Sequence, residues 1–143
     1  MPDPRIAALI PHAGAMCLLD RIESWSPEGI VCRARSHLDK LNPLRRAGRL
    51  GAVHGIEYAM QAAALHGALL EGGVPGRAGF LAVLRDVEIR VPWLDESAYG
   101  ELAVEADMER REETGVLYRF RVRAASGECL LAGRAAIALP RGG

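Results

Sequence analysis

The sequence lacks most of the features that point directly to a protein's chemistry. Its 18 basic and 18 acidic side chains cancel to a formal net charge of zero, so no overall field attracts nucleic acid or a membrane surface. It has no glycine-rich phosphate loop and no nucleophile elbow. The three cysteines, Cys17, Cys32 and Cys129, are odd in number and too far apart in sequence for a zinc or redox motif. Recognition and catalysis must therefore depend on local groups of side chains.

The chain also lacks segments that are typical of export or membrane insertion. Residues 1–5 are acidic and interrupted by proline, without the basic and apolar order of a secretory signal. The uncharged stretch between Glu57 and Glu71 has 13 residues, which is too short to cross a bilayer as a helix. With 143 residues, half of them apolar, the chain can build one core, so we expect a single cytoplasmic domain over residues 1–143.

Hydrophobic periodicity predicts two strands, one long helix and then four more strands. The helix is expected over residues 53–71, where Ala, Met, Leu and Gln favour a helix and two glycines end it. Small and apolar residues occupy nearly every side of this helix, which predicts burial all round. The strands are expected at residues 17–25, 30–37, 80–91, 101–108, 116–124 and 129–139. An antiparallel sheet wrapped around the helix, an α+β architecture, is the simplest way to bury it.

An arginine-rich segment, residues 38–51, separates the second strand from the helix. It has no clear period and is expected to form a long loop, and long loops in small domains are often functional. Arg45, Arg46 and Arg49 are its densest basic cluster and could meet a phosphate or an acidic partner. On the sequence alone, a solvated loop is the favoured interpretation.

Glu57 is the most conspicuous candidate for chemistry because it is a lone carboxylate within an apolar helix. Such a group is expected to be desolvated and therefore able to act as an acid or a base. His54 lies three residues earlier and Gln61 four residues later, so the three side chains fall in one column along the helix. The alternative is a structural one, in which the helix dipole favours Glu57, Gln61 bonds to the backbone and His54 belongs to the cap. The residue pattern by itself favours this alternative.

Two further histidines have different expected roles. His12 lies in the loop-like segment PHAG ahead of the first strand, where a lone histidine is usually a surface or hydrogen-bonded residue. His66 lies nine residues beyond the helix carboxylate and so on roughly the opposite helix face. We expect His66 to be structural.

Two segments together resemble a known family. Residues 10–21, IPHAGAMCLLDR, are similar to the proline-histidine segment, apolar run and Asp-Arg pair of the 3-hydroxyacyl-acyl-carrier-protein dehydratases, especially the small hot-dog dehydratases of aryl polyene-type pathways. Residues 55–64, GIEYAMQAAA, are similar to the central-helix motif of that family. Residues 80–82 and 86–92 resemble the strand that follows the helix. The resemblance covers most of the chain, and its motifs are specific only in combination.

The resemblance implies a hot-dog fold and a dimer. The acyl chain, carried on the phosphopantetheine of an acyl carrier protein, would enter a tunnel between subunits beside the two central helices. The expected assembly is a homodimer or a higher oligomer, with a heteromer containing a second hot-dog subunit as an alternative. We expect no cofactor and no metal, and the zero net charge gives no reason to expect a nucleic-acid or membrane partner.

The resemblance also assigns roles to individual residues. Glu57 would activate the hydroxyl that leaves or its water, while the family's usual base is a loop histidine. Gly48-Arg49-Leu50 stands where that histidine would be, and His12 and His54 are the two candidates to replace it. His12 is preferred because it belongs to the matching segment, whereas His54 has the more certain geometry relative to Glu57. The expected substrate-binding residues are Gln61, Arg49 and Gly55.

Three functions remain open at this point. The first is dehydration of a 3-hydroxyacyl thioester on the carrier protein, with the three loop arginines docking this acidic partner. The second is an acyl thioesterase in which Glu57 activates water against the thioester carbonyl. The third is a non-catalytic acyl-binding subunit, which the missing loop histidine suggests.

Overall fold

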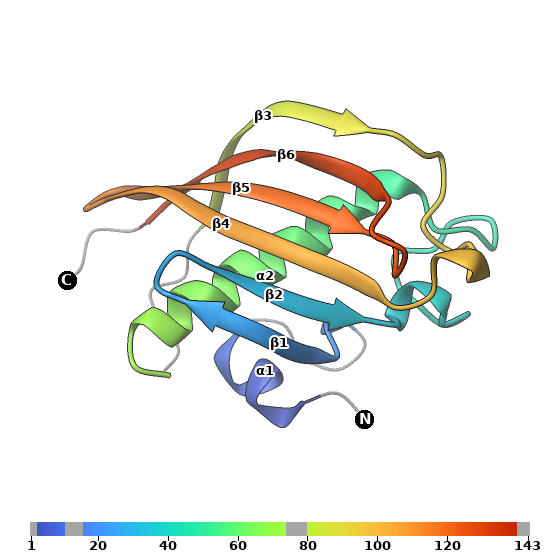
Figure 1. Cartoon of the computed structure of the whole chain (residues 1–143), viewed down its shortest axis with the longest axis horizontal. Coiled ribbons are helices and arrows are strands. Elements are labelled where there is room, and N and C mark those ends of the chain that lie inside the picture. Colours follow the sequence, from blue (N-terminus) through green and yellow to red (C-terminus); the bar gives the residue numbers. More distant parts are fainter. Residues whose placement is uncertain (1–2, 11–15, 74–79, 140–143) are drawn as a thin grey trace.

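The structure is a computed structural model that describes residues 3–10, 16–73 and 80–139. A six-stranded antiparallel sheet curves around one long helix, and its strand order is β1-β2-β4-β5-β6-β3 (Figure 1). The strands are β1 (Arg21–Ser26), β2 (Gly29–Ala34), β3 (Phe80–Ile89), β4 (Leu102–Glu112), β5 (Gly115–Arg123) and β6 (Cys129–Ala138). The helices are α1 (Pro4–Leu9) and α2 (Gly55–Leu70), with short 3-10 turns η2 (Ser36–Leu38), η3 (Ala52–His54) and η4 (Ser97–Tyr99). Along the sequence, the predicted succession of two strands, one long helix and four further strands is confirmed.

The inner face of the sheet supplies a large part of the core. On β5, Tyr118, Phe120 and Val122 are buried against α2, whereas Arg119 on the same strand is exposed. This is the period of two that a strand with one buried face requires, so the alternation read from the sequence is confirmed. Helix α2 packs against β2, β4 and β5, and its long axis crosses the sheet (Figure 1).

The first strand begins at Arg21, four residues later than the sequence predicts. Residues 17–20 form no regular secondary structure. The backbone of Leu18 is bonded to two side chains, since its N–H donates to Gln61 and its carbonyl accepts from Ser36. Side chains from distant parts of the chain therefore take the place of a neighbouring strand here.

The expectation that α2 is buried on every side is wrong for this chain. Its sheet-facing residues are buried, but Val53 just before it is 52% exposed and Glu57 is exposed. Ile56 and Met60 on the same side are only partly buried. The sheet covers one face of the helix, and the opposite face is apolar without being covered by the described part of this chain.

Gly55 brings the first turn of α2 into close contact with β6. A Cβ at Gly55 would overlap the side chain of Leu131, which is fully buried and has little room to move. Gly67 on the same helix has no atom within 4 Å of the corresponding position. The two glycines are therefore a matched pair, one in a crowded and one in an open position.

We expect Gly55→Ala to destabilise the fold and Gly67→Ala to leave it unchanged or stabilise it. Overpacking at Leu131 costs about 1–3 kcal/mol, whereas Gly55 is the first residue of α2 and gains less from alanine than the ~1 kcal/mol expected at a mid-helix position such as Gly67. Urea denaturation of both variants measures the difference. Equal stabilities would show that Leu131 yields without cost and that Gly55 is not required for packing.

Candidate active site

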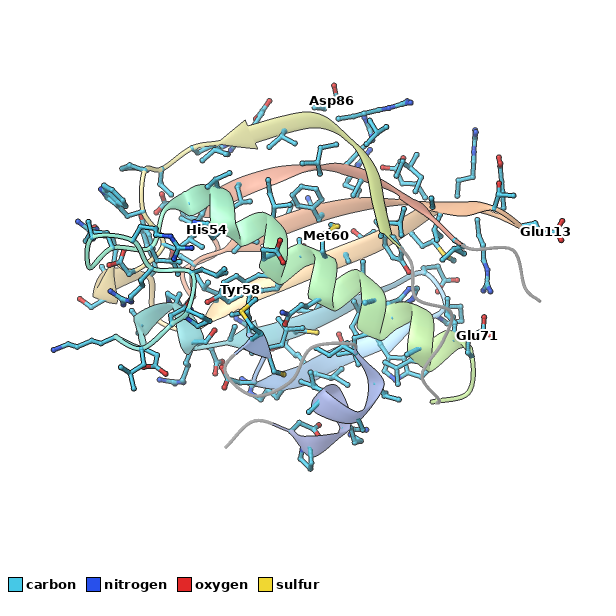
Figure 2. All side chains as sticks on the ribbon, turned by 180° about the vertical axis from the view of Figure 1, so that it is seen from behind. His54, Tyr58, Met60, Glu71, Asp86 and Glu113 are labelled. Carbon is cyan, nitrogen blue, oxygen red and sulfur yellow. The ribbon has the colours of Figure 1, made fainter. Side chains whose placement is uncertain are left out.

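Glu57 is the only carboxylate within α2 and lies in its first turn. Its side chain is on the exposed face of the helix, beside Val53, Ile56 and Met60. Figure 2, which views the molecule from behind, shows α2 in front of the sheet, with the labelled His54, Met60 and Glu71 marking its course. The carboxylate is therefore a lone charge on an apolar surface, and the described part of the chain does not provide the expected burial.

His54 is the N-cap residue of α2, as the structural alternative has it, but its side chain makes no capping hydrogen bond. It is partly buried. Between the described residues His54 and Glu57 there is no hydrogen bond and no ion pair. His54 and Glu57 are thus close in sequence at the start of α2 but are not bonded to each other.

Gln61 is fully buried, and both ends of its carboxamide bond to the backbone of the segment before β1. Its Oε1 accepts from the Leu18 N–H at 2.8 Å, and its Nε2 donates to the Met16 carbonyl at 2.6 Å. The structural alternative for Gln61 is thus confirmed. The column of three converging polar groups is not formed, because Glu57 points to the exposed side while Gln61 is inside.

A second buried polar group of α2, Tyr58, was not singled out from the sequence. Its hydroxyl lies 2.8 Å from Ser36 Oγ and accepts from Asn42 Nδ2 at 3.1 Å. Burial raises the pKa of Tyr58 to about 12, against the opposing effect of these two hydrogen bonds. The sequence did contain a signal for this site, because Tyr58 lies in an apolar helix directly after Glu57. A buried tyrosine normally requires a hydrogen-bond partner for its hydroxyl.

The arginine-rich loop is held by two carboxylates that come from the segment before η4. Asp95 accepts from Arg45 at 3.2 Å and from Arg49 at 3.0 Å, and Glu96 accepts from Arg49 at 2.8 Å. Arg49 also stacks on Trp93, with its guanidinium carbon 4.5 Å from the ring centre. Burial alone would raise the pKa of Asp95, but the hydrogen bonds from Arg49 and the Leu50 N–H outweigh it and hold that pKa below its ordinary value.

These contacts correct the interpretation of the loop as an uncommitted basic cluster. The guanidinium groups of Arg45 and Arg49 are engaged within the chain, and Arg46 donates to the carbonyls of Pro43 and Arg45. Arg49, Gln61 and Gly55, which the resemblance assigned to substrate binding, all have structural contacts in this chain. The acidic partners lie some 46 to 50 residues away in sequence, so no local pattern could reveal them.

Two buried histidines differ in how they are satisfied. His66 bonds to the Tyr118 hydroxyl at 2.7 Å and to the Ser26 carbonyl at 2.8 Å, which confirms its structural role. His37, in η2, is fully buried, and neither of its ring nitrogens has a hydrogen-bond partner among the described residues. Burial lowers the pKa of His37 to about 4, and the nearby Gly100 backbone is the first of the effects that oppose it. Nothing in the sequence pattern distinguishes His37.

His12 lies outside the described residues, so its position relative to Glu57 is not part of the described geometry. Within the described ranges, no group of three or more His, Cys, Asp and Glu side chains could hold a metal ion. The helices in these ranges are all too short or too polar to cross a membrane.

A curved antiparallel sheet around one long helix, with its strands in this order, defines the hot-dog fold. The helix carries its lone carboxylate, Glu57, in its first turn. The sequence model of the ApeP-like family, described as ApeP dehydratase, matches residues 4–141. The chain belongs to the ApeP-like dehydratase family, and the resemblance found in the sequence is confirmed.

Solved structures agree on the fold. The dehydratase heterocomplex ApeI:P from Xenorhabdus doucetiae is similar to this chain with a TM-score of 0.81 and 22% identity, over 99% of this chain and 92% of that one. Zebra fish thioesterase superfamily member 2 has a TM-score of 0.65 and 15% identity, over 95% and 92%. AziG of S. sahachiroi has a TM-score of 0.59 and 18% identity, over 93% and 98%. No curated protein matches the sequence.

Proposed function

We propose that this protein removes water from a 3-hydroxyacyl thioester carried on an acyl carrier protein, with Glu57 as the carboxyl group that acts on the departing hydroxyl. The single observation that carries the proposal is the position of Glu57 on the exposed, otherwise apolar face of α2. An apolar surface can bind an acyl chain, and the single carboxyl group on it can interact with the hydroxyl group of that chain. Membership of a dehydratase family supports the same reaction.

The site requires a cover, which a second hot-dog subunit would provide. Val53 is 52% exposed and Trp93, bridged to Gly51 just before α2, is 37% exposed, so apolar surface surrounds the start of the helix. Burying such surface favours association. A partner over this face would also exclude water from Glu57 and strengthen its interaction with the substrate. Either a second copy or a different hot-dog subunit meets this requirement.

The elimination needs a base as well as an acid. The base takes the proton from C2, the freed electron pair forms the C2=C3 double bond, and the hydroxyl leaves C3 as water after protonation. His12 and His54 are the two candidates for the base. His54 lies one turn before Glu57 on the helix, and His12 belongs to the segment that matches the family.

Mass analysis of a carrier-bound substrate panel tests the reaction. The purified protein, alone and mixed with a second hot-dog subunit, is incubated with 3-hydroxyacyl groups of several chain lengths on the carrier protein. Loss of one water from the carrier-bound species supports the dehydratase. Release of free thiol without an enoyl product would instead identify a thioesterase, an activity named for one of the similar structures. No product in either preparation would leave an acyl-binding subunit as the function.

Substituting each histidine by glutamine assigns the base. We expect the variant of the true base to lose about 100-fold or more in turnover, and the other variant to stay close to the wild type. The pH dependence of turnover in the two variants gives an independent check, because only loss of the base removes its limb of the profile. Full activity in both single variants would exclude both histidines.

A further inference from the structure

The carboxamide of Gln61 holds the segment before β1 against α2. It accepts from the N–H of Leu18 and donates to the carbonyl of Met16, at 2.8 and 2.6 Å. These two backbone groups, one acceptor and one donor, lie on either side of Cys17 and meet the two ends of a single carboxamide. The side chain therefore does what the edge of a neighbouring strand would do.

An amide fits this pair of backbone groups, whereas an ionised carboxylate or an apolar side chain does not. A carboxamide offers one acceptor and one set of donors, whereas a carboxylate offers acceptors alone and a methionine offers neither of comparable strength. Gln61 is fully buried, so water cannot replace a lost partner. The backbone groups of Met16 and Leu18 thus depend on this particular side chain.

The other bond to this segment comes from a separate network. The carbonyl of Leu18 accepts from Ser36 Oγ at 2.6 Å, and Ser36 Oγ lies 2.8 Å from the Tyr58 hydroxyl. Regular pairing with the sheet starts only later, where the Asp20 N–H donates to Arg33. Gln61 and Tyr58 are therefore two buried polar side chains of one helix, and only Gln61 contacts the segment directly.

We infer that Gln61 is a positioning residue for the dehydration and not a ligand of the substrate, an inference that rests on the proposed function. It fixes the backbone of residues 16–18 along α2, one helical turn from Glu57. In the sequence this anchored segment follows directly on the one that contains His12. Loosening it would change how residues 16–18 are held against the helix that carries Glu57, without removing any group that touches the substrate.

The experiment compares Gln61→Met and Gln61→Glu with Tyr58→Phe as the matched control. All three remove buried hydrogen bonds from α2, but Tyr58→Phe leaves both bonds of Gln61 in place. Steady-state kinetics with the carrier-bound substrate are measured under conditions where each variant is fully folded by circular dichroism. We expect kcat to fall by about 100-fold in Gln61→Met, as a displacement of about 1 Å can cause, with KM nearly unchanged. Tyr58→Phe should stay close to the wild type.

The pH dependence gives a readout that a merely structural role would not move. A protonated carboxylic acid has one donor and one acceptor and so imitates the carboxamide, whereas the carboxylate does not. The kcat of Gln61→Glu, divided by that of the wild type at the same pH, should therefore rise as the pH is lowered. The same ratio for Gln61→Met should stay flat.

Three results would overturn the inference. A raised KM with unchanged kcat in the Gln61 variants would make Gln61 a substrate ligand. Equal losses of kcat in Gln61→Met and Tyr58→Phe would reduce its role to general stability. A wild-type protein that forms no enoyl product, alone or with a second subunit, refutes the proposed function itself and the inference with it, and this outcome is distinct because it appears before any variant is made.

Discussion

Replacing Glu57 by glutamine should lower enoyl formation by about 1,000-fold, within the range that general acid–base groups contribute. Glutamine keeps the size and hydrogen-bonding reach of the side chain but cannot deliver a proton to the departing hydroxyl. Substrate binding should be largely retained, because the apolar face formed by Val53, Ile56 and Met60 is unchanged. The measurement is single-turnover formation of the enoyl thioester, followed by mass.

The loss of activity in Glu57→Gln can be separated from unfolding. Glu57 is exposed in the single chain and makes no hydrogen bond or ion pair to another described residue, so its replacement removes little from the fold beyond a favourable helix-dipole interaction. Glu71→Gln is the control, because Glu71 lies at the other end of α2 and pairs with Arg111. Enoyl formation within about threefold of the wild type in Glu57→Gln would exclude the carboxyl group from the chemistry.

Acidification should destabilise the protein through His37 before most carboxylates titrate. The pKa of His37 is about 4 in the folded chain, against 6.5 as its ordinary value. Above pH 6.5 both states are neutral and the residue contributes no pH dependence. Below pH 6.5 the unfolded chain takes up a proton that the folded chain does not, so stability falls until the folded-state pKa is reached. The expected loss between pH 7.5 and pH 5 is on the order of 2 kcal/mol.

The surroundings of His37 set the size of this effect. Burial is the main cause of the lowered pKa, while the negative charges of Asp20 and Asp95 oppose it and Arg45 adds to it. His66 acts in the same direction, since burial also lowers its pKa, so the wild-type slope contains both histidines. Urea denaturation of His37→Phe over the same pH range isolates the His37 share as the difference in slope. Parallel slopes for the wild type and the variant would show that His37 gains a partner or water on acidification.

The central strands β2, β4, β5 and β6 could be predicted because each buries one face. The alternation of Tyr118, Phe120 and Val122 with arginines reflects one layer packing on another, and this pattern is local in sequence. The prediction that a strand begins at residue 17 is wrong because its cause is not local in sequence. The backbone of Leu18 bonds to the side chains of Gln61 and Ser36, which lie far away along the chain.

The candidate site was predictable in its identity but not in its surroundings. Glu57 could be found as a lone charge in an apolar helix, and the family motif gave it a role. Its exposure could not be predicted, because whether a helix is covered on one side or on two depends on what else packs there. The commitment of Arg49 to Asp95 likewise depends on a contact between two loops that are distant in sequence.

The uncovered face of α2 also limits how this chain could be engineered. Exposed apolar residues such as Val53 are the usual targets when a protein is redesigned to be more soluble. Here, a lysine or glutamate at that position would put a second charge one helical turn from Glu57 and disturb the surface on which its proposed chemistry depends. On this face of α2, greater solubility of the isolated chain and catalytic activity are therefore opposing design goals. Charged residues that increase solubility should instead be introduced on the outer face of the sheet.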